Sequence, residues 1–190
     1  MKKLILASAS PWRKKILSTT GIPFTVEESG FDEDMSQKLA PRVLARRLAL
    51  GKALAVAKRH DEGIVISADT FGVFRGELLS KPHTAERARE MLTMLSGKTH
   101  TLLTGFAIID AKTKKRVTKT VGTRVTFRKL SAEEIDAYVA TGEPLKVAGA
   151  YAIQGEGAKL VKKVVGDRDN VAGFPLKDVL KELAKFGVRV

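Results

Sequence analysis

A short turn near the start of the chain combines residue types that suit phosphate binding. Residues 8–15 read Ser-Ala-Ser-Pro-Trp-Arg-Lys-Lys. The small side chains leave backbone N–H groups open to a ligand, and a helix beginning at Pro11 would add partial positive charge at its N-terminus. Arg13 and two lysines follow within one turn. The pattern is compatible with a phosphate cradle, although taken alone it favours an ordinary capped helix with a basic face.

A carboxylate follows the most apolar segment of the chain. Asp69 and Thr70 come directly after residues 63–68, GIVISA, a continuous β-branched run typical of a strand buried on both faces. Ligands of open α/β sheets bind beyond the carboxyl ends of strands. We therefore expect Asp69 at the end of this strand, where it could hold Mg²⁺ or accept a proton from water. An aspartate that merely terminates a strand is an equally good explanation.

Three weaker signals suit the same chemistry. Lys81 could return toward the sheet end that carries Asp69. The carboxylates of residues 32–34 suit a hard cation such as Mg²⁺. The amide of Gln154, within the glycine-rich segment 148–157, could read the edge of a base. Each of these could instead belong to a solvated loop or to a simple connection between elements.

Other chemistries lack their residue patterns. The chain has no cysteine, which excludes disulfides, thiolate catalysis and thiolate metal sites. His60, His83 and His100 stand in no zinc-binding spacing, so we expect all three on the surface or in loops. The sequence contains neither the G-x-S-x-G elbow of serine hydrolases nor the phosphate loop of P-loop ATPases.

Composition predicts one compact domain with a sizeable core. The chain has 190 residues, of which 44% are hydrophobic. A net charge of +13 attracts polyanions, either nucleoside triphosphates or nucleic acid, but a solvated lysine-rich surface is the simpler explanation. Aromatic residues make up 6% and form no stacking platform. The N-terminal apolar run stops at Ala7 and no stretch could span a bilayer, so we expect a cytoplasmic protein.

The predicted elements alternate between strand and helix. Strands are expected at residues 3–7, 24–28, 63–68, 71–79, 99–110, 116–128 and 159–165, and helices at 11–20, 41–59, 84–95, 131–140 and 175–186. The longest helix should bury Val43 and Leu44 on its apolar side. Segments 99–110 and 116–128 should form a hairpin. This order favours an α/β fold with a mixed twisted sheet flanked by helices.

Taken in order, the separated motifs resemble the Maf family, also called septum formation inhibitor proteins. The matching segments are 6–13 (LASASPWR), Glu33, Lys52, 67–70 (SADT), 81–82 (KP), 95–100 (LSGKTH), 148–155 (AGAYAIQG) and 173–176 (GFPL). They extend over nearly the whole chain, so the resemblance predicts one domain over residues 1–190. Several motifs in the right order are more specific than any one of them.

The resemblance implies a Maf/Ham1, ITPase-like fold with a cleft between two lobes, usually as a homodimer. It implies hydrolysis of nucleoside triphosphates between the α and β phosphates, with a divalent cation: Mg²⁺, Mn²⁺ or Co²⁺. Asp69 would be the proton acceptor and Glu33 its acidic partner at the metal. The residues that would contact phosphates are Ser8, Ser10, Arg13, Lys52 and Lys81. Those that would set substrate preference are Trp12, Thr70 and Gln154.

The three residues that would set substrate preference resemble two different branches of that family. The branch that acts on dTTP and UTP usually has Arg where this chain has Trp12. The branch that acts on 7-methyl-GTP has Trp there, but has Gln and Lys where this chain has Thr70 and Gln154. Two positions of three favour dTTP and UTP, and modified nucleotides in a house-cleaning role are a further option. The competing hypothesis is a basic nucleic-acid-binding or division-regulating protein without catalysis, although we do not expect nucleic acid as a partner.

Overall fold

The computed structural model describes residues 2–189, which form two compact units. The first unit contains the chain up to residue 69, residues 104–121 and the chain from residue 173 onward. The second unit contains residues 70–103 and 122–172. The predicted domain 1–190 includes one residue at each end outside the described range, and its being a single domain stays a prediction.

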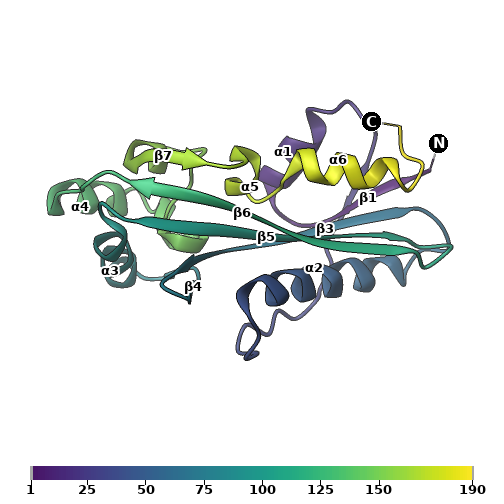
Figure 1. The fold of residues 1–190 in the computed structure, drawn as a ribbon, viewed down its shortest axis with the longest axis horizontal. Coiled ribbons are helices and arrows are strands. Elements are labelled where there is room, and N and C mark those ends of the chain that lie inside the picture. Colours follow the sequence, from purple (N-terminus) through teal and green to yellow (C-terminus); the bar gives the residue numbers. More distant parts are fainter. Residues whose placement is uncertain (1, 190) are drawn as a thin grey trace. The chain divides into compact units, whose positions relative to one another are not determined.

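The strands form a seven-stranded mixed sheet (Figure 1). They are β1 Leu4–Ala7, β2 Thr25–Glu27, β3 Ile64–Phe74, β4 Glu77–Leu79, β5 Thr99–Asp110, β6 Arg116–Phe127 and β7 Val161–Val165. The order is β2-β1-β3-β5-β6-β7, with β4 paired to β3 outside this path. Strand β1 is parallel to β2 and β3, whereas β4 is antiparallel to β3 and β7 is antiparallel to β6. The predicted mixed α/β class is confirmed.

All of the helices except α5 (Arg168–Val171), which was not predicted, begin near their predicted starts. The helices are α1 Pro11–Ser18, α2 Pro41–Ala57, α3 Ala85–Leu95, α4 Ala132–Ala140, α5 Arg168–Val171 and α6 Leu176–Ala184, with 3₁₀ turns at Glu143–Lys146, Ala148–Ala150 and Glu156–Leu160. Helix α4 begins with a capping box between Ser131 and Glu134. No helix among residues 2–189 is long and apolar enough to cross a bilayer.

The first unit has three layers: helices α1 and α6, the sheet, and helix α2 (Figure 1). Successive side chains of its strands point to opposite faces of the sheet, and both faces are apolar. On β1, Leu4 and Leu6 pack with α1 and α6, whereas Ile5 packs with α2. On β3, Ile66 packs toward α1 and α6, and Val65 packs toward α2. The central strands are therefore apolar on both sides, as the GIVISA segment predicts.

Helix α2 lies unusually close to the sheet. A β-carbon at Gly105 on β5 would lie 2.1 Å from the carbonyl oxygen of Ala45 on α2, so glycine is required at this crossing. The helix presents alanines at every fourth position, 45, 49, 53 and 57, and all four are buried. Val43 is 40% exposed, which corrects the prediction that it faces the core. It lies one position before the buried pair Leu44 and Ala45, just outside the apolar face.

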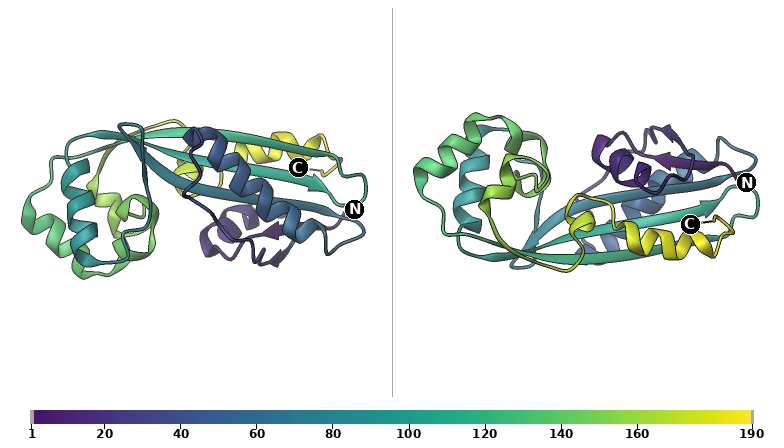
Figure 2. Two further views of the ribbon diagram at one scale, coloured as in Figure 1. Left: turned by 90° about the horizontal axis from the view of Figure 1, so that it is seen from below. Right: turned by 90° about the horizontal axis from the view of Figure 1, so that it is seen from above.

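The second unit packs α3 beside α4 (Figure 2). Its core includes three mutually perpendicular rings, those of His100, Phe127 and Tyr151. His100 is 2% exposed and its Nε2 lies 2.9 Å from the hydroxyl of Tyr151, so the predicted surface position of this histidine is wrong. It alternates into the core along β5, and burial lowers its pKa to about 4.

Candidate active site

Asp69 lies on the face of β3 that is covered by α2. Side chains alternate along a strand, so Asp69 shares this face with Val65 and Ser67. The Ser67 hydroxyl donates a hydrogen bond to the carbonyl of Ala49 on α2, which fixes the strand against the helix two residues before Asp69. Strand β3 continues to Phe74, so the prediction that Asp69 ends its strand is wrong. It is the neighbouring strand β1 that ends here, at Ala7.

Lys52 extends from α2 to the carboxylate of Asp69. It occupies the row of buried positions Leu44, Leu48 and Val56, spaced four residues apart on one face of the helix. A lysine in such a row is rare unless its charge is paired. Its ammonium contacts a carboxylate oxygen of Asp69 and lies 2.8 Å from Oε1 of Glu33. The interruption of an apolar row by one lysine is the sequence signal that could have identified Lys52 without any family resemblance.

Of the acidic residues 32–34, Glu33 is the one that contacts Lys52 in the described structure. Its side chain is 47% exposed and belongs to the loop between β2 and α2. The carboxylate of Asp34 instead accepts hydrogen bonds from the backbone N–H and the hydroxyl of Ser36. Asp34 therefore stabilises a local turn, as an ordinary loop aspartate does.

The turn before α1 is preorganised by its own serines and arginine. Ser10 is the N-cap of α1 and its hydroxyl oxygen accepts from the backbone N–H of Arg13. The hydroxyl oxygen of Ser8 accepts from the Ser10 backbone N–H at 3.2 Å and from Nη1 of Arg13 at 3.3 Å. Nε of Arg13 donates to the carbonyl of Gly173 at 2.9 Å. These hydrogen bonds fix the shape of the turn, and its role as a phosphate cradle stays a prediction.

Burial and the neighbouring charges shift the pKa values of Asp69 and Arg13. Burial raises the pKa of Asp69 above its usual value, and the positive charges of Lys52 and Arg13 offset this rise only in part. Burial lowers the pKa of Arg13, whereas the negative charges of Asp69 and Glu33 raise it. The cluster therefore consists of two carboxylates and two cations: Asp69, Glu33, Lys52 and Arg13.

Trp12 is half-buried on α1, directly before Arg13. The ammonium of Lys15 lies 5.6 Å from the centroid of its ring, close enough for a cation–π interaction. The ring therefore already has one partner at its face. Its predicted role in substrate preference stays a prediction.

The other predicted site residues belong to the second unit. Thr70 is half-buried on β3, Lys81 is exposed after β4, and Gln154 is half-buried between two 3₁₀ turns. The structure thus brings together six predicted residues in the first unit: Ser8, Ser10, Arg13, Glu33, Lys52 and Asp69. The roles of all of these residues stay predictions.

The glycines beside Gln154 have a structural explanation. A β-carbon at Gly155 would lie 2.3 Å from the carboxylate of Glu143, and one at Gly157 would lie 2.6 Å from the hydroxyl of Tyr138. Glu143 accepts hydrogen bonds from that hydroxyl and from the backbone N–H groups of residues 156 and 157. The space that these glycines leave open is therefore filled by the side chains of Glu143 and Tyr138.

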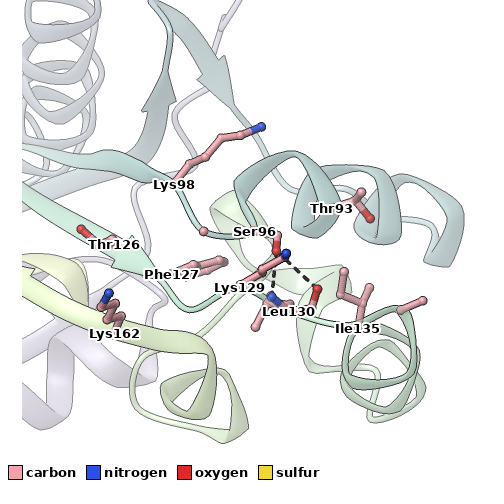
Figure 3. Close-up of a pocket in the computed structure, with 11 residues that line it drawn as sticks. Thr93, Ser96, Lys98, Thr126, Phe127, Lys129, Leu130, Ile135 and Lys162 are labelled. Atoms are coloured by element: carbon pink, nitrogen blue, oxygen red, sulfur yellow. Dashed lines mark hydrogen bonds between the residues drawn. The ribbon is translucent and has the colours of Figure 1, made fainter.

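A separate cavity of about 650 Å³ lies in the second unit (Figure 3). It is lined by residues from the end of α3, the start of α4 and strands β6 and β7, and Lys129 and Lys162 are among them. The hydroxyl of Ser96 accepts from the backbone N–H of Leu130 at 2.8 Å and braces its wall. None of the predicted site residues lines this cavity.

The carboxylates of Asp69 and Glu33 suit a divalent cation. Within residues 2–189, no three His, Asp or Glu side chains come together as a metal cage. Mg²⁺ is nevertheless commonly held by one or two carboxylates while water and phosphate oxygens complete its coordination. In this structure the Lys52 ammonium pairs with both of these carboxylates.

Comparison with solved structures first defines the class of fold. The chain is similar to the structure of the Staphylococcus aureus Ham1 protein, with a TM-score of 0.55 and 14% identity over 98% of this chain and 100% of that one. The likeness is one of fold.

Sequence comparison then defines the family. The model of the Maf family, described as Maf-like protein, matches residues 3–186, and the chain belongs to this family. A relative from Moorella thermoacetica named dTTP/UTP pyrophosphatase is 48% identical over 100% of this chain and 98% of its own length. A relative of the same name from Bacillus cytotoxicus is 46% identical over 98% of this chain and 96% of its own length.

Proposed function

We propose that this protein is a nucleoside triphosphate pyrophosphatase that hydrolyses dTTP and UTP to the monophosphate and pyrophosphate. The observation that carries the proposal is the ion-pair cluster of the buried Asp69 and Lys52 with the half-exposed Glu33, beside the turn that begins at Ser8. The relatives named dTTP/UTP pyrophosphatase, which match this chain over nearly its whole length, support the choice of substrate.

The proposed reaction begins with water held at the carboxylate of Asp69. The water oxygen forms a bond to the α-phosphorus as its proton passes to Asp69, and the bond between that phosphorus and the α–β bridging oxygen breaks. The electron pair of the broken bond stays on the bridging oxygen, which leaves as part of pyrophosphate. The raised pKa of Asp69 favours its role as the proton acceptor, because a more basic carboxylate binds a proton more readily.

The remaining charges would bind the triphosphate. Ser8, Ser10 and the N-terminus of α1 would hold phosphate oxygens, and Arg13 and Lys52 would stabilise the leaving pyrophosphate. Asp69 and Glu33 would hold a divalent cation, Mg²⁺, Mn²⁺ or Co²⁺, which supplies positive charge to the phosphate oxygens when bound. Lys81, from the second unit, is proposed as a further phosphate contact.

A substrate panel tests the proposed function. Each nucleoside triphosphate is incubated with Mg²⁺, Mn²⁺ or Co²⁺, and phosphate is measured with and without added inorganic pyrophosphatase. We expect phosphate only after pyrophosphatase is added, and the highest kcat/KM for dTTP and UTP. Phosphate without pyrophosphatase, accompanied by a nucleoside diphosphate, would contradict the reaction class.

Trp12 favours a second candidate substrate, 7-methyl-GTP, because the branch of the family that acts on this nucleotide has Trp at the same position. A base stacked on such a ring would gain about 1–3 kcal/mol. We propose that Thr70 and Gln154 outweigh it, in line with the names of the relatives. Comparison of kcat/KM for dTTP, UTP and 7-methyl-GTP in Trp12→Arg and Gln154→Ala decides between them. Trp12→Arg should raise the preference for dTTP and UTP, and Gln154→Ala should weaken discrimination between bases.

A homodimer and a cytoplasmic location are further parts of the proposal. The homodimer is expected from the family resemblance, and the cytoplasmic location is expected from the sequence. Light scattering coupled to gel filtration measures the first, and cell fractionation measures the second.

A further inference from the structure

The loop that carries Glu33 is anchored to helix α2 at two points. The first is Arg59, which follows α2. Its Nη1 donates to the carbonyl of Glu28 at 2.9 Å, and its Nη2 donates to the carbonyl of Ser29 at 2.8 Å. Nη1 also lies 2.7 Å from a carboxylate oxygen of Glu27. The start of the loop is thereby held to the helix.

The second anchor is the ring of Phe31. A β-carbon at Gly51 would lie 2.2 Å from Cζ of Phe31 and within 2.7 Å of two further ring carbons. The ring therefore lies on the helix backbone at a position where any side chain would displace it. Gly51 stands inside α2, where glycine is about 0.5–1 kcal/mol less favourable than alanine, so its presence has a structural reason in this contact.

The Phe31 contact lies directly beside the charged cluster. Gly51 immediately precedes Lys52 on α2, and Phe31 is two residues before Glu33 on the loop. Two residues of extended chain span at most about 7 Å, so the seated ring limits how far the Glu33 backbone can move from Lys52. The Glu33 carboxylate is 47% exposed, and its own ion pair at 2.8 Å is too solvated to fix the loop alone.

We propose that Phe31, seated on Gly51, is a positioning residue that holds Glu33 beside Lys52 and Asp69 and thereby sets the affinity for a divalent cation. The inference rests on the proposed function, in which Glu33 and Asp69 hold that cation. Phe31 acts through Glu33 alone and touches no substrate. Removing the ring lowers the fraction of protein in which Glu33 is in place, and the apparent dissociation constant rises by the inverse of that fraction.

The test measures Mn²⁺ binding to the full chain by calorimetry and by electron paramagnetic resonance, without nucleotide. Phe31→Ala and Gly51→Ala should each weaken Mn²⁺ binding about tenfold, for a competent fraction of about one tenth. The double variant should bind no more weakly than Phe31→Ala, because both changes remove the same contact. Val43→Ala, on the exposed side of α2, is the matched control and should bind as the parent does. Circular dichroism and the thermal midpoint check that each variant is folded.

The decisive comparison is made in a Glu33→Gln background. If Phe31 acts through Glu33, Phe31→Ala should weaken Mn²⁺ binding in the parent and have no further effect beside Glu33→Gln. An equal loss in both backgrounds, or unchanged binding in Phe31→Ala, would overturn the inference while the proposed role of Glu33 stands. Unchanged binding in Glu33→Gln itself would instead remove the cation role of Glu33, and the inference with it. Phe31→Leu, which keeps an apolar contact, should restore part of the affinity and serves if Phe31→Ala does not fold.

Discussion

Asp69 is the residue on which the proposed chemistry depends most. It is 5% exposed and its carboxylate contacts the ammonium of Lys52. Asp69→Asn keeps the size of the side chain but removes its charge and basicity, so kcat for dTTP should fall by about 10²-fold or more. Steady-state kinetics measures the loss, and an unchanged circular dichroism spectrum shows that the fold is intact. Activity close to that of the parent with every nucleotide would remove Asp69 from this role.

Lys52 should control the pH at which Asp69 becomes active. Asp69 must be deprotonated to accept a proton, and Lys52 lowers its pKa against the rise caused by burial. In Lys52→Met that pKa rises further, so the acidic limb of kcat/KM should move to higher pH. Lys52→Arg keeps the charge and should leave the limb near its original position. A pH–rate profile in Lys52→Met whose acidic limb does not move would show that the two residues are not electrostatically coupled.

The residues of this cluster were not equally predictable from the sequence. Asp69 and the turn at Ser8 follow from residue types placed after apolar strands. Glu33 was indicated only as one of three neighbouring carboxylates, and Lys52 was named from the family resemblance although its place in an apolar row of the helix could have indicated it. The course of the loop that brings Glu33 to Lys52 cannot be derived from residue spacing. The contact of Phe31 with Gly51 joins positions 20 residues apart, and a glycine inside a helix does not reveal which side chain requires it.

At the scale of elements, the position of α2 brings Lys52 to Asp69. A β-carbon at Gly105 would lie 2.1 Å from the carbonyl oxygen of Ala45, so Gly105→Ala must move α2 away from β5. We expect a destabilisation of about 1–3 kcal/mol, typical of overpacking, together with a loss of kcat as Lys52 is displaced. Urea unfolding and kinetics measure the two effects.

The matched control for this variant is Gly76→Ala. Gly76 has open space around the position of a β-carbon and a φ of +88°, so its replacement reports the backbone cost alone. It should destabilise the fold without lowering kcat. If Gly105→Ala left both stability and kcat unchanged, close packing of α2 would not be what positions Lys52.

The elements themselves were largely predictable. Apolar runs and their periodicity located most of the strands and helices. The end of β3 was misplaced, because the polar residues Asp69 and Thr70 look like a strand terminus although pairing with β4 continues to Phe74. The short helix α5 was also missed, since four residues give no periodic pattern.

At the scale of the whole molecule, stability should depend on the neutral state of His100. Its folded pKa is about 4, below the usual value of 6.5, because it is buried in the core of the second unit. Between these values the unfolded chain binds a proton that the folded chain does not, so stability is lost as the pH falls from 6.5 to about 4. The full loss corresponds to roughly 3 kcal/mol.

Thermal midpoints measured from pH 7 to pH 4 test this dependence. His100→Gln keeps a polar group near the Tyr151 hydroxyl but cannot titrate in this range, so its midpoint should fall less steeply than that of the parent. Because the replacement lowers stability at every pH, the quantity compared is the slope of the thermal midpoint against pH. Equal slopes in the two proteins would assign the pH dependence to other groups.

The central claim is that water held at Asp69 attacks the α-phosphorus. Hydrolysis of dTTP in water enriched in ¹⁸O, followed by mass spectrometry of the products, tests it most directly. The account predicts one ¹⁸O atom in dTMP and none in pyrophosphate, because the oxygen of the attacking water stays with the phosphorus that it attacks. Label in pyrophosphate, or a diphosphate product with labelled orthophosphate, would place the attack at another phosphorus and contradict the account.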